Sequence, residues 1–154
     1  TSVFPARIDV PPISLPAWAL LPALLIAGTS LAILYRAHRR DLGWVMAGTL
    51  TGFFGAAFGE RLLGPALGVC VGASLVGLAG NLLARLRPKP SALLVIPGIT
   101  LLLPGSAGFR GLHALMHNDV VSGIGIAATA LTVAGALVAG LLVANALLPA
   151  PRGL

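Results

Sequence analysis

The feature that most constrains this chain is an apolar run that proline and glycine interrupt twice. Residues 93–103 are apolar apart from Thr100 and the pair Pro97-Gly98, and a second pair, Pro104-Gly105, follows directly. Proline lacks the N–H that an α-helix needs, and glycine adds conformational freedom. Within a bilayer, irregular backbone is tolerated only where protein or a water-filled cavity surrounds it. The run therefore predicts a broken membrane helix, which is typical of the binding region of a transporter.

Composition places the chain among helical membrane proteins. Hydrophobic residues make up 57% of the sequence and charged residues only 9%, which is far from the balance of a soluble domain. The net charge is +6, but the arginines lie in short clusters at the ends of apolar runs, where they influence membrane topology. Because aromatic residues are few, no stacking platform for bases is expected, and we predict no nucleic-acid partner.

The apolar runs predict an all-α membrane protein with about five transmembrane helices, embedded in the lipid bilayer within a domain of residues 16–148. The expected spans cover approximately residues 16–34, 42–59, 63–84, 91–109 and 121–148. The fourth is the one broken by the two Pro-Gly pairs, and a short helix is expected after it, over residues 110–117. Residues 1–15 are expected to form an extended lead-in or linker, and residues 149–154 a short tail.

Two basic segments predict the orientation in the membrane. Residues 35–41 and 85–90 are rich in lysine and arginine and are separated by two spans, so they should lie on one side, which the positive-inside rule makes cytoplasmic. With five crossings the N-terminus is then outside and the C-terminus inside. In the alternative, residues 91–117 re-enter the membrane instead of crossing it, and the last span runs from inside to outside.

Small residues recur at four-residue steps along several spans, which lets helix backbones approach closely. The rows are Gly48, Gly52 and Ala56; Thr51, Gly55 and Gly59; Gly64, Gly68 and Gly72; and Ala128, Thr132, Ala136, Gly140 and Ala144. Asn81 and Thr100 are polar residues in apolar surroundings, and we expect them to form hydrogen bonds between helices.

Two arginines are candidates for binding an anion. Arg61 follows Glu60 at the end of the second span, and the alternative is that the pair anchors the helix at the membrane interface. Arg110 follows the second break, beside a helix for which Ser106 is a suitable N-cap. The free amides of that helix end, Ser106 and Arg110 can together bind a carboxylate. Alternatively, Arg110 extends outward to the headgroups.

The sequence does not favour an enzyme. His113 and His117 have a spacing that metal ligands use, but Ala114-Leu115-Met116 between them lacks the glutamate base of a metalloprotease. The four acidic residues are scattered, and no nucleophile–base pair can be assembled. We therefore predict no catalytic residue, no metal and no cofactor, and interpret both histidines as incidental to an interfacial helix.

Four motifs together resemble the threonine/serine exporter (ThrE-like) family. They are Val95-Ile96-Pro97-Gly98-Ile99, Leu103-Pro104-Gly105-Ser106, Phe109-Arg110-Gly111-Leu112 and, upstream, Gly59-Glu60-Arg61-Leu62-Leu63. The resemblance covers about residues 16–148 and concerns the smaller module of the family. That module is the C-terminal half of a longer exporter in some members and a separate small subunit in others.

The resemblance implies a multi-pass protein of the bacterial cytoplasmic (inner) membrane that exports threonine and serine with the proton motive force. Its partner is then a larger ThrE-type subunit or a fused half, or the chain forms a homo-oligomer. Relatives made of two subunits imply small dicarboxylates as another cargo. A second hypothesis is a scaffold that transports nothing and stabilises a larger transporter.

A broken helix offers free amides on one side of the break and free carbonyls on the other, which match the carboxylate and the ammonium of an amino acid. We therefore expect the substrate-binding residues to be those of the break and the two arginines. They are Pro97, Gly98, Pro104, Gly105, Ser106, Arg110 and Arg61.

If the break binds the solute, alanine at Pro104 and Gly105 should lower transport by roughly tenfold, because a continuous helix withdraws hydrogen bonds from a charged group. Efflux from cells expressing Pro104→Ala and Gly105→Ala measures the effect. Unchanged efflux by a variant that is folded and inserted would contradict the hypothesis.

Overall fold

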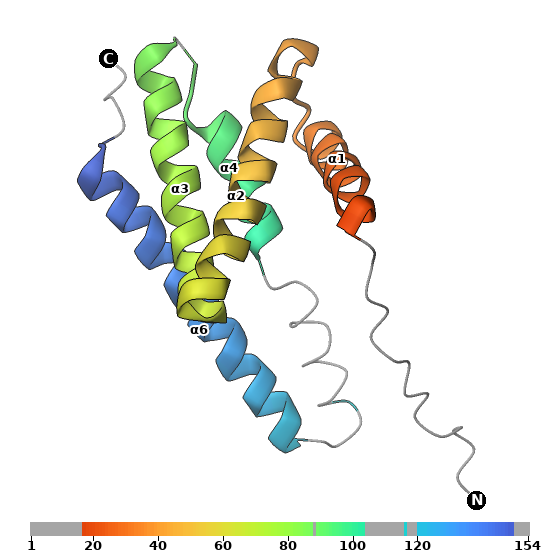
Figure 1. Ribbon diagram of the computed structural model, residues 1–154, viewed down its shortest axis with the longest axis vertical. Helices are drawn as coiled ribbons and strands as arrows, with labels where there is room; N and C mark the ends of the chain where they lie inside the picture. Colours follow the sequence, from red (N-terminus) through yellow and green to blue (C-terminus); the bar gives the residue numbers. More distant parts are fainter. Residues whose placement is uncertain (1–16, 88, 104–115, 117–119, 150–154) are drawn as a thin grey trace, which may run out of the picture.

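The structure is a computed structural model that describes residues 17–87, 89–103, 116 and 120–149. Within these ranges the chain is helical and contains no strand (Figure 1). The elements are α1 (Ala17–Leu34), the 3₁₀ helix η1 (Arg39–Asp41), α2 (Leu42–Leu63), α3 (Pro65–Leu86), α4 (Ala92–Leu102) and α6 (Val120–Leu147). The predicted lead-in, the predicted helix at 110–117, and most of the tail lie outside the described residues.

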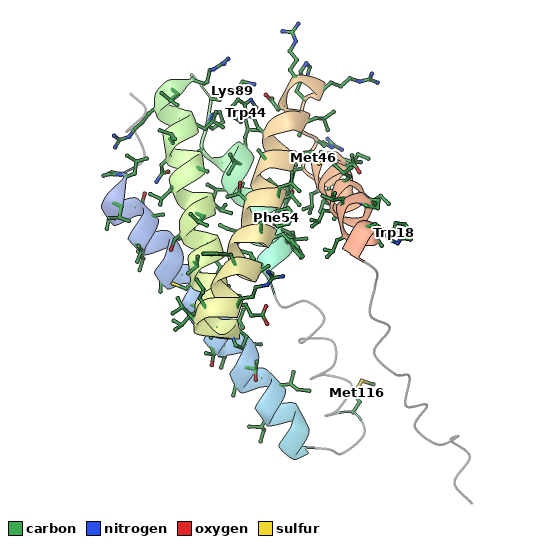
Figure 2. The ribbon with its side chains drawn as sticks, viewed as in Figure 1. Trp18, Trp44, Met46, Phe54, Lys89 and Met116 are labelled. Carbon is green, nitrogen blue, oxygen red and sulfur yellow. The ribbon has the colours of Figure 1, made fainter. Side chains whose placement is uncertain are left out.

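Helix length and composition fit a membrane protein. Three helical stretches are long and apolar enough to cross a bilayer, namely Arg39–Leu63, Pro65–Leu86 and Gly123–Leu147. Two apolar helices are shorter, Trp18–Leu34 and Ala92–Leu102. Large apolar side chains cover the outside, and Trp18, which is 75% exposed, points away from the bundle (Figure 2). The all-α prediction is confirmed for the described residues, while five crossings stay a prediction.

The connection between α2 and α3 differs from the prediction. We expected the second span to end near Gly59, with a turn at Glu60-Arg61, but α2 continues to Leu63. The chain reverses at Gly64, whose φ of +88° favours glycine because it has no Cβ. Pro65 then begins α3, where its missing N–H costs nothing. Arg61 therefore lies in the last turn of α2.

Glycines bring the backbone of α2 close to those of α3 and α4. Toward α3, a Cβ added to Gly55 would lie 3.1 Å from the Cα of Gly72, and one added to Gly59 would lie 2.9 Å from the Cα of Gly68. Toward α4, Gly48 contacts the carbonyl of Leu94, and a Cβ on Gly52 would lie 2.8 Å from the Gly98 carbonyl oxygen. The predicted role of these glycines in close helix packing is confirmed.

The fourth small-residue row is used only in part. Gly140 contacts the carbonyl of Cys70 on α3, and Ala144 lies against Gly77. Ala128 and Thr132, nearer the start of α6, are exposed. The first half of α6 is therefore open to lipid or to another protein (Figure 1).

The contacts define the helix directions. Gly48 of α2 contacts Leu94 of α4, and Gly52, one turn later, contacts Gly98, also one turn later. Residue numbers increase in the same direction along both helices, so α4 is parallel to α2. In α3 and α6 the residue numbers of the pairs Cys70–Gly140 and Gly77–Ala144 increase together too, so these helices are also parallel.

Because α3 returns antiparallel to α2, the start of α2, the end of α3, the start of α4 and the end of α6 share one end of the bundle (Figure 1). The two basic segments lie there, joined by an ion pair between Lys89 and Asp41. Since α4 starts at this basic end and α6 ends there, the end of α4 and the start of α6 point to the opposite end. Residues 104–115 and 117–119 lie outside the described ones, so crossing and re-entry of 91–117 both stay predictions.

The predicted break at Pro97-Gly98 is wrong, because α4 continues through both residues. Both are buried in the bundle, where packing against α2 and α3 holds the helix despite the lost backbone hydrogen bond. The helix ends at Leu102, just before the second pair. Leu103 is extended, with ψ of 135°, as expected of a residue before proline. The rest of the predicted break lies outside the described residues.

Alanine at Gly48 should destabilise the protein by about 1–3 kcal/mol, because the added methyl group meets the rigid carbonyl of Leu94. Alanine at Gly135, around which a Cβ would meet nothing within 4 Å, should be neutral or stabilise by up to about 1 kcal/mol. Thermal unfolding of Gly48→Ala and Gly135→Ala in detergent compares them. Equal midpoints would contradict the packing described for α2 and α4.

Candidate functional site

The short helix α4 is the centre of the candidate site. It has 11 residues and so rises only about 16 Å, roughly half of a hydrocarbon core of about 30 Å. It packs against α2, α3 and α1. Three pockets among the described residues each have part of their wall formed by α4 or its N-cap Ser91.

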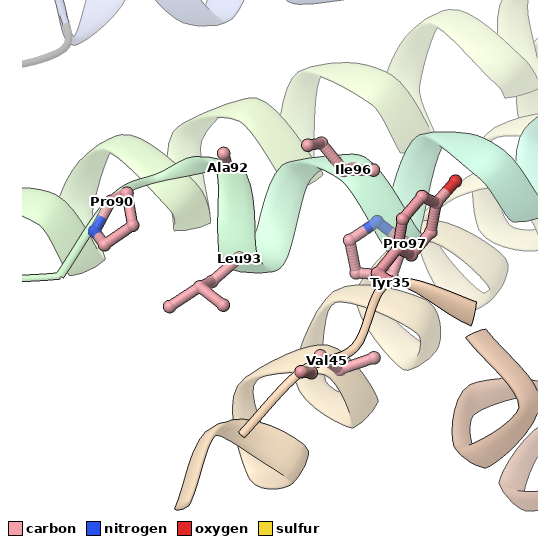
Figure 3. A pocket seen from close by; sticks show the side chains of 8 residues that line it. Tyr35, Val45, Pro90, Ala92, Leu93, Ile96 and Pro97 are labelled. Atoms are coloured by element: carbon pink, nitrogen blue, oxygen red, sulfur yellow. The ribbon is translucent and has the colours of Figure 1, made fainter. Parts of the chain in front are cut away.

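The first pocket lies between α4 and the segment that joins α1 to α2, and measures about 240 Å³ (Figure 3). Its lining is apolar except for the hydroxyl of one tyrosine, and consists of Tyr35, Ala37, Val45, Pro90, Ala92, Leu93, Ile96 and Pro97. Pro97 has no N–H to donate to the carbonyl of Leu93, one helical turn earlier. The backbone beside this pocket therefore lacks one helical hydrogen bond.

The second pocket, of about 450 Å³, lies between α1 and the end of α4. At its edge, the hydroxyl groups of Tyr35 and Thr100 are 2.7 Å apart, which ties the end of α1 to α4. Thr100 donates its one proton to the carbonyl of Ile96 at 2.8 Å, so Tyr35 is the donor in the pair. The expectation that Thr100 bonds between helices is confirmed.

The third pocket, which we call the asparagine pocket, lies between α3, α4 and α6 and measures about 240 Å³. It is lined by Gly77, Asn81, Ser91, Val95, Leu141 and Asn145. The amide nitrogen of Asn81 donates to Asn145 Oδ1 at 3.2 Å and to the carbonyl of Leu148 at 2.7 Å. These bonds confirm the expected role of Asn81 between helices.

The structure does not bring all predicted site residues together. Pro97 and Gly98 lie in the middle of α4, level with Gly52 of α2. Arg61 follows Gly52 by nine residues on the same helix, about 13 Å further along the axis, and is exposed. Pro104, Gly105, Ser106 and Arg110 lie outside the described residues, so their predicted role stays a prediction.

Sequence reasoning missed Asn145. It is one of two asparagines that lie near the ends of parallel apolar helices, and only their meeting across α3 and α6 makes them a pair. One signal in the sequence could have pointed to Asn145: like Asn81, it is an amide side chain within an apolar run, a few residues before the end of that run. The described residues contain no group of three metal-ligating side chains, while His113 and His117 lie outside them.

Comparisons with known proteins identify the family. The sequence profile described as "Threonine/Serine exporter, ThrE" matches residues 21–147. The chain belongs to the threonine/serine exporter family. It is also 36% identical over 123 residues to a protein of Corynebacterium glutamicum named "Threonine/serine exporter", and the match covers 77% of this chain. It covers only 25% of that relative, so the chain corresponds to about a quarter of it. No solved structure matches.

Removing the hydroxyl group of Tyr35 should loosen α1 from α4. We expect Tyr35→Phe and Thr100→Val each to lower the free energy of unfolding by about 0.5–1.5 kcal/mol. The free energy of unfolding of the double variant should fall by less than the sum of the two single losses, because both changes remove the same hydrogen bond. Denaturant unfolding in micelles measures this, with Thr129→Val as control, since that hydroxyl bonds only the carbonyl of Gly125 in its own helix. If the losses in unfolding free energy of the two single variants add up fully in the double variant, the hydrogen bond between Tyr35 and Thr100 is not formed.

Proposed function

We propose that the chain is one part of a secondary exporter of threonine and serine in the cytoplasmic membrane. Membership of the threonine/serine exporter family supports export of small amino acids. The observation that carries the proposal is α4, a proline-containing helix of about half the membrane thickness. One side of it, with Leu94, Pro97 and Gly98, is buried against its neighbours, and α4 or its N-cap lines each pocket described above. Such a helix is more typical of the solute-binding region of a transporter than of a helix that only packs against lipid.

The chain works with a larger module. It corresponds to a quarter of its relative, and the first half of α6 presents exposed apolar side chains such as Ile124 and Leu131. Those side chains suit a second membrane module, either a separate subunit or a fused half. A homo-oligomer is the alternative that uses the same face.

The proposed mechanism uses both sides of the break after α4: the carbonyl end of the helix attracts the ammonium group of the solute, and the residues that follow supply donors for its carboxylate. Beyond the end of α4, Pro104 provides no N–H, and the continuation toward Ser106 and Arg110 offers donors for a carboxylate. Because α4 is parallel to α2 and ends in the direction of Arg61, that arginine can assist from the same end of the bundle. The proton motive force supplies the energy for export.

A scaffold that only stabilises a larger transporter is the second candidate, and the exposed face of α6 favours it. The two roles differ in what Arg61 does. In a transporting subunit, changes at Arg61 alter solute handling, whereas in a scaffold they alter assembly alone.

Efflux from cells loaded with threonine and serine dipeptides tests the function. The chain is expressed alone and with a larger family-type partner. We expect efflux with the partner, loss of efflux when a protonophore collapses the proton gradient, and a roughly tenfold lower rate for Arg61→Ala. Arg61→Lys, which keeps the charge, is the matched control and should retain more activity.

Three results would change this conclusion. Efflux by the chain alone would show a homo-oligomer instead of a half-transporter. Export of succinate without threonine would replace the cargo by dicarboxylates. No efflux of either solute, with the complex intact, would favour the scaffold.

A further inference from the structure

The asparagine pocket contains hydrogen-bonding groups that the packing of the helices does not use. Asn81 is 6% exposed, and both protons of its amide nitrogen are taken, one by Asn145 Oδ1 and one by the Leu148 carbonyl. Because a carbonyl can only accept, the nitrogen of Asn81 must face Leu148, and its oxygen must face the other way. This oxygen accepts no hydrogen bond from any described residue.

The Asn81 oxygen is not sealed inside the protein. Every fully buried polar side-chain atom in the described part of the chain has a partner, so an atom without a described partner keeps some exposed surface. Asn145 uses its oxygen to accept from Asn81, which leaves its amide protons without an acceptor among the same residues. Buried polar side chains normally have hydrogen-bond partners, and among the described residues only the nitrogen of Asn81 has them. Asn81 lines the asparagine pocket, so a ligand there is a candidate partner for the oxygen.

The third polar group is Ser91, which begins α4 and lines the same pocket. Its hydroxyl group makes no capping bond to the helix, so it is available to a ligand. The first turn of α4 adds the positive end of a helix dipole, which favours an anionic group. The pocket thus combines one acceptor, on Asn81, with donors on Asn145 and Ser91.

Resting on the proposed function, we infer that the asparagine pocket binds the backbone of the exported neutral α-amino acid. The ammonium group donates to Asn81 Oδ1. The carboxylate accepts from Asn145 Nδ2 and from the hydroxyl of Ser91. The pocket lies at the basic end of the bundle, which is cytoplasmic by the predicted topology, so it is the site where the solute is loaded.

The lining also sets the class of solute. The remaining walls are Gly77, Val95 and Leu141, which suit a small aliphatic or hydroxylated side chain. None of the lining residues is charged. A dicarboxylate would bring a second negative charge that no cation in the pocket balances, and burying an unpaired charge is costly.

Binding of radiolabelled threonine to the complete transporter in nanodiscs tests the inference. We expect Asn145→Ala to weaken threonine binding about tenfold or more, because a hydrogen bond to a charged group is lost, and Ser91→Ala to weaken it severalfold. Asn145→Ala also removes the acceptor of one Asn81 bond, whereas Ser91 makes no capping bond, so Ser91→Ala is the variant that should leave the helix packing unchanged. Thr129→Ala, on the same helix and bonded only to its own backbone, is the matched control and should bind as the wild type does. An excess of succinate should not displace threonine.

Wild-type affinity in both Asn145→Ala and Ser91→Ala would overturn the inference while leaving threonine export in place. Displacement by succinate at concentrations similar to threonine would overturn the assigned solute class. A wild-type protein that neither binds nor exports threonine would overturn the proposed function itself. The efflux and binding assays together therefore separate a wrong pocket from a wrong cargo.

Discussion

The close approach of α2 to α3 on one side and to α4 on the other is the constraint on which the rest of the structure depends. In a bilayer there is little hydrophobic gain when two helices meet, because lipid is as apolar as the side chains. Contact must come from backbones that fit closely. Gly55 and Gly59 provide this toward α3, and Gly48 and Gly52 provide it toward α4. These contacts bury one side of α4, including Pro97, and a short helix with an internal proline would be unsuitable if lipid surrounded it completely.

The position of α4 is the basis of the proposed export pathway. The helix ends after 11 residues, and the pockets described above lie along it. Two of these pockets are largely apolar, whereas the asparagine pocket offers both an acceptor and donors. A zwitterionic solute needs that combination. The exposed apolar side chains in the first half of α6, Ile124 and Leu131, form the face to which the proposal assigns a second membrane module.

Much of the fold was predictable from the sequence because its signals are local. Apolar length predicted the helices, the small-residue rows predicted most close contacts, and the Pro-Gly motifs predicted the family, which the comparisons confirm. The predictions of a break at Pro97 and of a turn at Glu60-Arg61 were both wrong because they relied on local residue preferences alone. Proline and charge favour an interruption locally, but packing on neighbouring helices outweighs that preference at Pro97, and the glycine with positive φ moves the turn to Gly64. Of the residues predicted to form the site, Pro97 and Gly98 are buried between the helices, and Arg61 lies further along α2, away from both of them.

The sequence by itself determined the class of the protein, its membrane character and the residues at which helices can approach, since hydropathy and residue size act over a few neighbouring positions. Only the tertiary structure decided which helices meet and in which direction they run. Asn81 and Asn145 are 64 positions apart, and the parallel packing of α6 on α3 is what brings their amides into one pocket. The physical reason is that a contact between distant segments depends on the shapes of whole helix faces, which no local pattern encodes.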